Sequence, residues 1–241
     1  MKDFIAFNEE RAEFYWWMST LFAQELTSEH IRLYQGPAMN TLFEVLTQTP
    51  ALSQPAMALQ TAVQHLNRRQ DAQLELAADF CGLFLCSPKT GALPYASVYT
   101  PGSGLMNSQP ACDMEAWLAH SGLAQRKHFN EPADHLAVIL DYLGNLILLT
   151  NQHGNETDAE QGMLSQLNLL QTMLLNWLPD FVADIRQKDK FGFYAAAAGL
   201  LLAFCQADQH FLQGTESGMD STGSHHHAAD SGISSSESHP M

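Results

Sequence analysis

Three ionisable side chains stand close together at the start of a strongly apolar stretch. In NEPADHLAVILDYLGNLILL, residues 130–149, they are Glu131, Asp134 and His135. Carboxylates beside an imidazole are the groups that catalyse proton transfer or bind a metal ion. They also cap helices, and they can hold a charged group of a partner that lies along the apolar surface. The composition of this segment alone does not choose among these roles.

A helix that begins at this segment explains two of the three side chains. Asn130 suits an N-cap, and Pro132 suits a first helical turn because its missing N–H would have no partner there. We therefore expect a long helix to begin at Asn130. Glu131 and Asp134 would then lie at the positive end of the helix dipole, which stabilises each by about 0.3–1 kcal/mol. His135 remains unexplained, because it stands where the apolar stripe begins and needs a partner if it is buried.

The alternative hypothesis is an enzyme, a helical metal-dependent hydrolase that uses His120, His128 and His135 with Asp134. Helical metal sites usually carry a Glu followed three residues later by a His, on two facing helices, and this pattern is absent here. Three adjacent histidines at 225–227 cannot all converge on one ion. The sequence also lacks GxGxxG, GxxxxGK[ST], HExxH and GxSxG. We therefore predict neither an enzyme nor a metal site.

The composition indicates an acidic globular protein. The chain has 241 residues, of which 46% are hydrophobic and 15% charged, so it can bury a large core. Its formal net charge of -15 disfavours nucleic acids and anionic membranes and attracts basic peptides. The N-terminus lacks the features of a secretory signal, no apolar run reaches ~18 residues, and the cysteines form no CxxC pair. We therefore expect a soluble, cytoplasmic protein with reduced thiols.

Apolar residues recur at helical spacing through most of the chain. Predicted helices cover residues 9–22 (with Asn8 as N-cap), 28–34, 38–46, 53–67, 70–85, 112–121, 130–149, 158–178 and 191–212. The sequence thus predicts an N-terminal helical half, 1–86, and a C-terminal half, 130–212. They are joined by a long irregular loop and a short helix, 87–129. Residues 213–241 contain no Lys or Arg and little to bury, which indicates a disordered tail.

The connecting segment holds the residues best placed to bind a partner. Four prolines and three glycines fall within residues 87–110, and a loop of this length tends to be functional. Within it, PYASVY alternates like a strand but has no predicted sheet to join. Tyr15, Trp16 and Trp17 are interpreted as core residues. Tyr95, Tyr99 and Trp117 lie in or near the loop, where an apolar groove rimmed by acids would suit an apolar peptide with a basic end.

Five segments together resemble the TorD/DmsD/NarJ family of redox-enzyme maturation chaperones. They are RAEFYWWMSTLFAQEL, DFCGLFLC, PYASVY, EPADHLAVILDYL and NWLPDF, and the likeness covers about residues 5–212. The E-P-x-D-H element is the most specific of them, and the tail after Gly214 is not a family feature. The resemblance implies an all-α helical bundle of the TorD-like type.

The resemblance also implies a function. It is the binding of a molybdenum reductase precursor, that of trimethylamine N-oxide reductase, and of its twin-arginine leader peptide. The chaperone would assist insertion of the molybdenum cofactor and prevent premature export. In this sequence the implied leader-binding residues are Asp134, His135, Phe80, Leu83, Phe84, Pro94, Tyr95, Ser97 and Tyr99. Of the cluster at 131–135, Glu131 and Pro132 would mainly set up the helix. The resemblance implies no cofactor beyond weak guanosine-nucleotide binding, which we expect to be non-catalytic because the chain has no P-loop.

Two further expectations concern partners and assembly. A third hypothesis is a helical bundle that recognises only the folded reductase and ignores the leader. The long connection at 87–130 would let the two helical halves pair within one chain or between two chains, because exchange of identical elements is a low-cost route to dimers. We therefore predict a monomer accompanied by domain-swapped oligomers.

Overall fold

Helices form wherever the sequence repeats apolar residues at helical spacing. The computed structural model describes residues 2–100, 108–123, 125, 129–152 and 156–222, and these contain helices and turns but no named strand. The predicted all-α fold is therefore confirmed. In chain order the helices are α1 (Lys2–Ala23), α2 (Ser28–Tyr34), α3 (Pro37–Gln48), α4 (Ser53–Leu66), α5 (Ala72–Phe84), α6 (Ala96–Tyr99), α7 (Gln109–His120), α8 (Leu136–Thr150), α9 (Glu156–Leu169), the π-helical turn η1 (Leu170–Leu175), α10 (Leu178–Lys188) and α11 (Phe193–Thr222).

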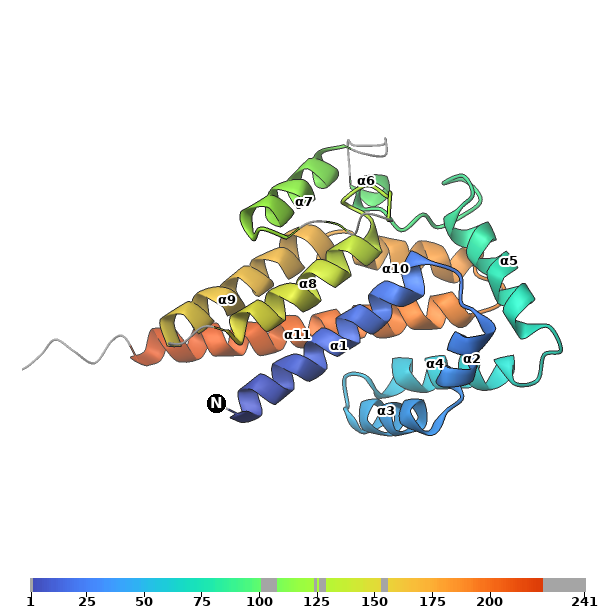
Figure 1. Ribbon diagram of the computed structural model, residues 1–241, viewed down its shortest axis with the longest axis horizontal. Coiled ribbons are helices and arrows are strands. Elements are labelled where there is room, and N and C mark those ends of the chain that lie inside the picture. Colours follow the sequence, from blue (N-terminus) through green and yellow to red (C-terminus); the bar gives the residue numbers. More distant parts are fainter. Residues whose placement is uncertain (1, 101–107, 124, 126–128, 153–155, 223–241) are drawn as a thin grey trace, which may run out of the picture.

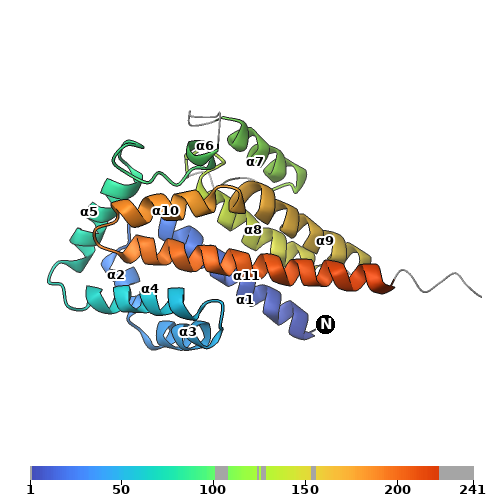
Figure 2. The ribbon, with the colours of Figure 1, turned by 180° about the vertical axis from the view of Figure 1, so that it is seen from behind.

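Four helices run along the length of the molecule and form its centre. Helix α1 packs along α8, α8 packs against α9, and the long helix α11 lies beside them (Figure 1). Helices α2 to α5 gather at one end, where α4 packs against α11, while α6 and α7 lie over the start of α8 (Figure 2). Because α1 and α4 belong to the predicted N-terminal half, and α8 and α11 to the C-terminal half, the two halves share one core.

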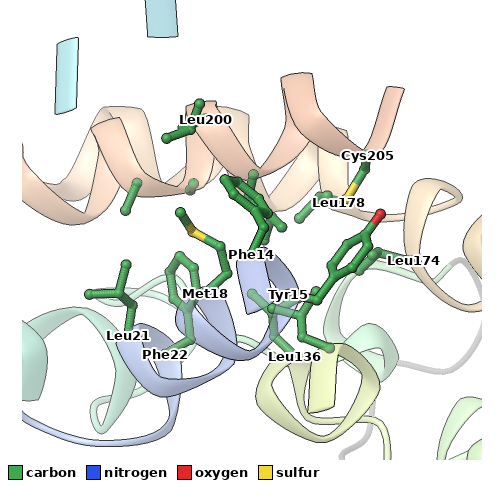
Figure 3. Close-up of a cluster of buried hydrophobic side chains, with 14 of the residues drawn as sticks. Phe14, Tyr15, Met18, Leu21, Phe22, Leu136, Leu174, Leu178, Leu200 and Cys205 are labelled. Carbon is green, nitrogen blue, oxygen red and sulfur yellow. The ribbon is translucent and has the colours of Figure 1, made fainter. Parts of the chain in front are cut away.

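The apolar face of α1 supplies much of that core. Phe14, Tyr15 and Met18 point from α1 toward α11, and Leu136 of α8 closes the cluster from the other side (Figure 3). The ring of Phe14 stacks on that of Phe204 with 3.7 Å between the ring centroids. Full burial of each such side chain stabilises the fold by about 1.5–3 kcal/mol, so these contacts hold the halves together.

A buried ion pair ties the two predicted halves across the same interface. Arg11 Nε lies 2.7 Å from Asp208 Oδ1, and each side chain is only 3% exposed. The remaining donors of Arg11 bond to Asn8 Oδ1 at 2.8 Å and to Gln166 Oε1 at 2.9 Å. Tyr15 donates its hydroxyl to Asp208 Oδ2 at 2.7 Å. Because every charge here has partners, the pair is tolerated inside the core.

The N-terminal boundary predicted at Asn8 is wrong. Helix α1 already begins at Lys2, and Asn8 is a fully buried residue in its interior. Its side chain bonds across the core, to Arg11 and, with Nδ2, to Asn151 Oδ1 at 2.8 Å. An asparagine is a good N-cap by local preference, but here Arg11 on the same helix and the distant Asn151 use its polar atoms.

Two boundaries in the C-terminal half also differ from the prediction. Pro179 lies in the first turn of a helix, α10, where a proline loses no hydrogen bond, whereas the sequence had suggested that a helix ends near it. Helix α11 continues to Thr222, ten residues beyond the predicted helix end at Leu212. Once a helix is nucleated each further residue is added at little cost, which composition alone does not reveal. The rest of the predicted tail, with the three adjacent histidines, lies outside the described residues.

Candidate functional site

The segment at 130–135 is a turn that precedes a helix, and the prediction of a helix from Asn130 is wrong. Helix α8 begins at Leu136, with His135 as its N-cap. The backbone N–H of Leu136 donates to Pro94 O at 2.8 Å, and Ala96 N donates to Asp134 O at 3.1 Å. These two bonds form an isolated antiparallel bridge between Tyr95 and His135. The bridge holds His135 in an extended conformation, so local capping signals at Asn130 do not decide where the helix starts.

Asp134 lies inside the protein and binds the loop that the sequence marked as functional. The residue is 0% exposed, and its Oδ2 atom accepts hydrogen bonds from Ser97 N at 2.8 Å and from Ser97 Oγ. Ser97 stands in α6, which the sequence had suggested to be a strand. A carboxylate at the start of a helix satisfies N–H groups that have no helical partner. Asp134 therefore fixes α6 against the start of α8.

His135 is a neutral helix cap between two aromatic rings. It is 5% exposed, and its Nδ1 accepts the backbone N–H of Ala137 at 3.0 Å. The rings of Tyr95 and Phe129 meet it edge-on, with centroid distances of 4.8 and 5.2 Å. Burial lowers the pKa of His135 to about 3, so the imidazole is uncharged at neutral pH and Nδ1 stays free to accept. His135 thus has a hydrogen-bond partner at Nδ1 and two aromatic rings packed against it.

Two tyrosines anchor the loop on either side of α6. Tyr95 donates its hydroxyl to Glu131 Oε2 at 2.6 Å, and Tyr99 donates to Asp184 Oδ2 at 3.1 Å. Burial first, and then the nearby carboxylates, raise the pKa of both phenols, so both remain donors at neutral pH. The backbone of Pro94 takes part through its carbonyl oxygen. The structure therefore brings five predicted residues together: Pro94, Tyr95, Ser97, Asp134 and His135.

The other predicted leader-binding residues lie apart from this cluster. Phe80, Leu83 and Phe84 are 4%, 3% and 3% exposed and belong to the apolar core beneath α5. Phe84 meets Tyr194 edge-on with centroids 5.1 Å apart, and Phe181 lies between Phe84 and Tyr99. In this conformation these side chains are covered by the protein itself. Their role in binding a leader therefore stays a prediction.

The residues of the alternative metal site are not arranged as a site where the structure describes them. His120 is exposed at the end of α7, and His135 is buried with its Nδ1 already bonded. His128 lies outside the described residues. Across the described parts of the chain, no group of three His, Cys, Asp or Glu side chains is placed to hold a metal ion.

An open groove lies next to the loop, and the sequence did not predict its position. It has a volume of about 540 Å³ and runs between α1, α7 and α8. Trp16 of α1, which the sequence assigned to the core, is one of its walls. The sequence feature that could have indicated the position of Trp16 is Gly144, a glycine in a helix of bulky apolar residues. A Cβ atom there would lie 2.6 Å from Trp16 Nε1, so the glycine admits the indole against α8. The residues that line the groove are Trp16, Ser19, Thr20, Ala23, Gln24, Leu118, Leu123, Gln125, Phe129, Ala137, Val138, Asp141, Tyr142 and Asn145.

Comparisons with known proteins agree with this architecture. The family model described as "Nitrate reductase delta subunit" matches residues 49–183. The chain is 55% identical over 216 residues to "Chaperone protein TorD" of Photobacterium profundum, covering 90% of this chain and 100% of that relative. It is 49% identical over 214 residues to the TorD chaperone of Aliivibrio fischeri, covering 89% of this chain and 100% of that relative. For the TorD chaperone of Vibrio cholerae the identity is 44% over 212 residues, covering 88% of this chain and 96% of that relative.

No helix among the described residues is both long and apolar enough to cross a bilayer. Each of these relatives is at least 44% identical to this chain over 88–90% of its length. The chain therefore belongs to the TorD/DmsD/NarJ family of redox-enzyme maturation chaperones.

Proposed function

We propose that this chain is the cytoplasmic chaperone of a molybdenum-containing reductase, trimethylamine N-oxide reductase. It binds the reductase precursor together with its twin-arginine leader peptide and holds it until the molybdenum cofactor has been inserted. Export of an empty enzyme is thereby prevented. The protein acts by binding and catalyses no reaction. The observation that carries the proposal is the 55% identity, over 90% of this chain and 100% of the relative, to a protein named as a TorD chaperone.

The charge and surface of the protein suit such a guest. A twin-arginine leader begins with a basic region and continues with an apolar stretch. The net charge of -15 attracts the basic region at long range. An apolar groove with aromatic walls lies open between α1, α7 and α8 and offers a surface for the apolar stretch.

Titration calorimetry with a synthetic leader peptide tests the proposal. We expect micromolar affinity or better, weakening as salt rises because exposed charges are screened beyond about 10 Å at 0.1 M salt. A control peptide with two lysines in place of the two arginines keeps the charge but loses the planar, two-pronged hydrogen bonding of guanidinium. It should therefore bind more weakly than the arginine peptide.

The outcome that contradicts leader capture is the absence of any heat at low salt, together with no competition by the peptide for the precursor. If the protein then binds only the folded reductase, the third hypothesis, a bundle that ignores the leader, takes its place.

A further inference from the structure

We infer that the carboxyl pair Asp79–Asp189 is a pH-sensitive switch that holds α5 against the turn into α11. When the pair carries a proton, one carboxyl group donates a hydrogen bond to the other. Loss of that proton places two negative charges in contact, and their repulsion releases α5. The switch is a property of the fold and does not depend on the proposed function.

The geometry of Asp189 decides which of the two groups carries the proton. Its Oδ1 accepts Gly192 N at 2.6 Å, and its Oδ2 accepts Ala195 N at 2.7 Å. Both oxygens of Asp189 are therefore already acceptors. An ionised carboxyl group can only accept hydrogen bonds, and a protonated one can donate. A hydrogen bond between the two groups thus requires the proton on Asp79.

Asp79 lacks the contacts that would stabilise its ionised form. Its Oδ2 atom is buried, and no donor reaches it. Neither Asp79 nor Asp189 forms an ion pair with a Lys, Arg or His in the part of the chain that the structure describes. Burial first, and then the charge of Asp189, raise the pKa of Asp79 to about 7. The proton of the carboxyl pair is therefore lost close to neutral pH.

The other titratable groups at this place cannot act as the switch. Tyr194 of α11 lies close to both carboxyl groups, to Tyr34 of α2 and to Glu25, an exposed residue between α1 and α2. Burial raises the pKa of both phenols, so Tyr34 and Tyr194 stay neutral between pH 5 and pH 8. Glu25 adds a further negative charge.

The cations nearest in sequence do not neutralise the carboxyl pair. Lys188 is paired with Asp184 at 2.8 Å, and Arg69 is paired with Glu75. Lys190 follows Asp189 directly, but it is exposed and forms no ion pair with it. An ionised carboxyl pair would therefore keep its repulsion.

Helix α5 is placed so that it can move without the rest of the fold. It lies at one end of the molecule, beside the turn from α10 into α11 (Figure 2). Side chains, and not close packing of its backbone, hold it to the other helices. Phe80 and Phe84 meet the ring of Tyr194 edge-on, with centroids 5.7 and 5.1 Å apart. A region with few close contacts opens at a lower free energy than the whole fold.

Release of α5 would expose an apolar surface. The face of α5 that is now covered consists of Leu76, Phe80, Leu83 and Phe84, none more than 4% exposed. The carboxyl pair therefore controls, through pH, how often this face reaches solvent.

Hydrogen exchange of the wild-type protein, followed by mass spectrometry without any leader peptide, measures the opening. Exchange rates are compared at pH 5 and pH 8, each relative to the intrinsic amide rate at that pH. Amides of α5 should exchange about tenfold faster at pH 8, the effect of the raised pKa of Asp79 reduced for a half-buried group. Amides of α8, in the centre of the molecule, should show no such difference.

Two variants show which group is responsible. Asp79→Asn keeps a donor toward Asp189 and has no proton to lose, so exchange of α5 should be the same at both pH values. Asp71→Asn, at the exposed start of the same helix, is the matched control and should keep the tenfold difference.

Three results would overturn the switch. The first is an exchange rate of α5 in the wild type that does not depend on pH. The second is an equal increase in every helix at pH 8, because the whole fold would then loosen. The third is an Asp79→Asn protein that keeps the pH dependence of the wild type, because another group would then carry the proton. Leader binding is measured separately, so failure of the proposed function leaves these results unaffected.

Discussion

Replacing Asp79 by asparagine should change how the stability of this fold depends on pH. Asp79 stands on α5 beside Asp189, which lies just before α11. The carboxylate of Asp189 accepts Gly192 N at 2.6 Å and Ala195 N at 2.7 Å, and Gly192, with φ 86°, lets the chain turn into the helix. Burial first, and then the neighbouring charge of Asp189, raise the pKa of Asp79 to about 7. Below that pH, Asp79 is a neutral acid that can donate a hydrogen bond to Asp189.

The sign and size of the effect follow from the shifted pKa of Asp79. Its pKa is about 7 in the folded protein, against an ordinary value of 3.8. Between these values the folded protein keeps a proton that the unfolded chain has released, so the free energy of unfolding falls as pH rises. At about 1.36 kcal/mol per pKa unit, the full shift corresponds to about 4 kcal/mol. Because the carboxyl group is only half-buried, solvent reduces this, and we expect about 1–2 kcal/mol.

Urea unfolding at pH 5 and pH 8, at constant ionic strength, measures the effect. Asparagine can still donate to Asp189 and has no proton to lose. The free energy of unfolding of Asp79→Asn, relative to the wild type, should therefore rise by about 1–2 kcal/mol from pH 5 to pH 8. Asp71→Asn, at the exposed start of the same helix, serves as the control and should show no such rise. An Asp79→Asn difference that is the same at both pH values would refute the coupling of the two carboxyl groups.

Three more measurements test other parts of the structure. Arg11→Met should lower the free energy of unfolding by about 3–5 kcal/mol, because Asp208 is left buried without its partner, and a loss below 1 kcal/mol in urea unfolding would contradict this. Asp134→Asn should lower it by about 1–3 kcal/mol, because a neutral amide oxygen accepts hydrogen bonds from Ser97 more weakly than the carboxylate does, and an unchanged urea midpoint would show that the charge of Asp134 is unimportant to these two bonds. Refolding at high concentration should yield slowly interconverting oligomers, since the pairing of the halves on either side of 87–129 can form between chains, and a single species in light scattering under all conditions would exclude exchange.

The helices were predictable from the sequence because local spacing decides them. Residues 53–67 and 70–85 were predicted as helices, and α4 and α5 begin and end within two residues of those bounds. Apolar residues at helical spacing can be buried in only one way once a core forms, so periodicity is a strong signal. Where a helix ends is decided by smaller energies, and there the sequence was less informative.

The site was less predictable because its geometry depends on contacts distant in sequence. Asn130 and Pro132 gave a good local reason for a helix start, but the bond from Leu136 N to Pro94 O moved it by six residues. Nothing in the local sequence shows that bond. The aromatic residue Trp16 has helical spacing with core residues and nevertheless forms a groove wall, because Gly144 on another helix makes room for it. Such pairings are set by the packing of the whole fold.

The burial of Asp134 and His135 changes what a role in leader binding must mean for them. Substitution of a residue that contacts the leader can weaken binding without lowering the stability of the fold, because the side chain of such a residue faces solvent in the free protein. Asp134 bonds to Ser97 and His135 bonds to the first turn of α8, so both hold elements of the fold. A change at either must disturb the fold and the groove together, since the His135 ring supports Phe129 from behind. Loss of stability and loss of affinity are therefore expected to be coupled at these two positions, and separable at exposed groove residues such as Thr20.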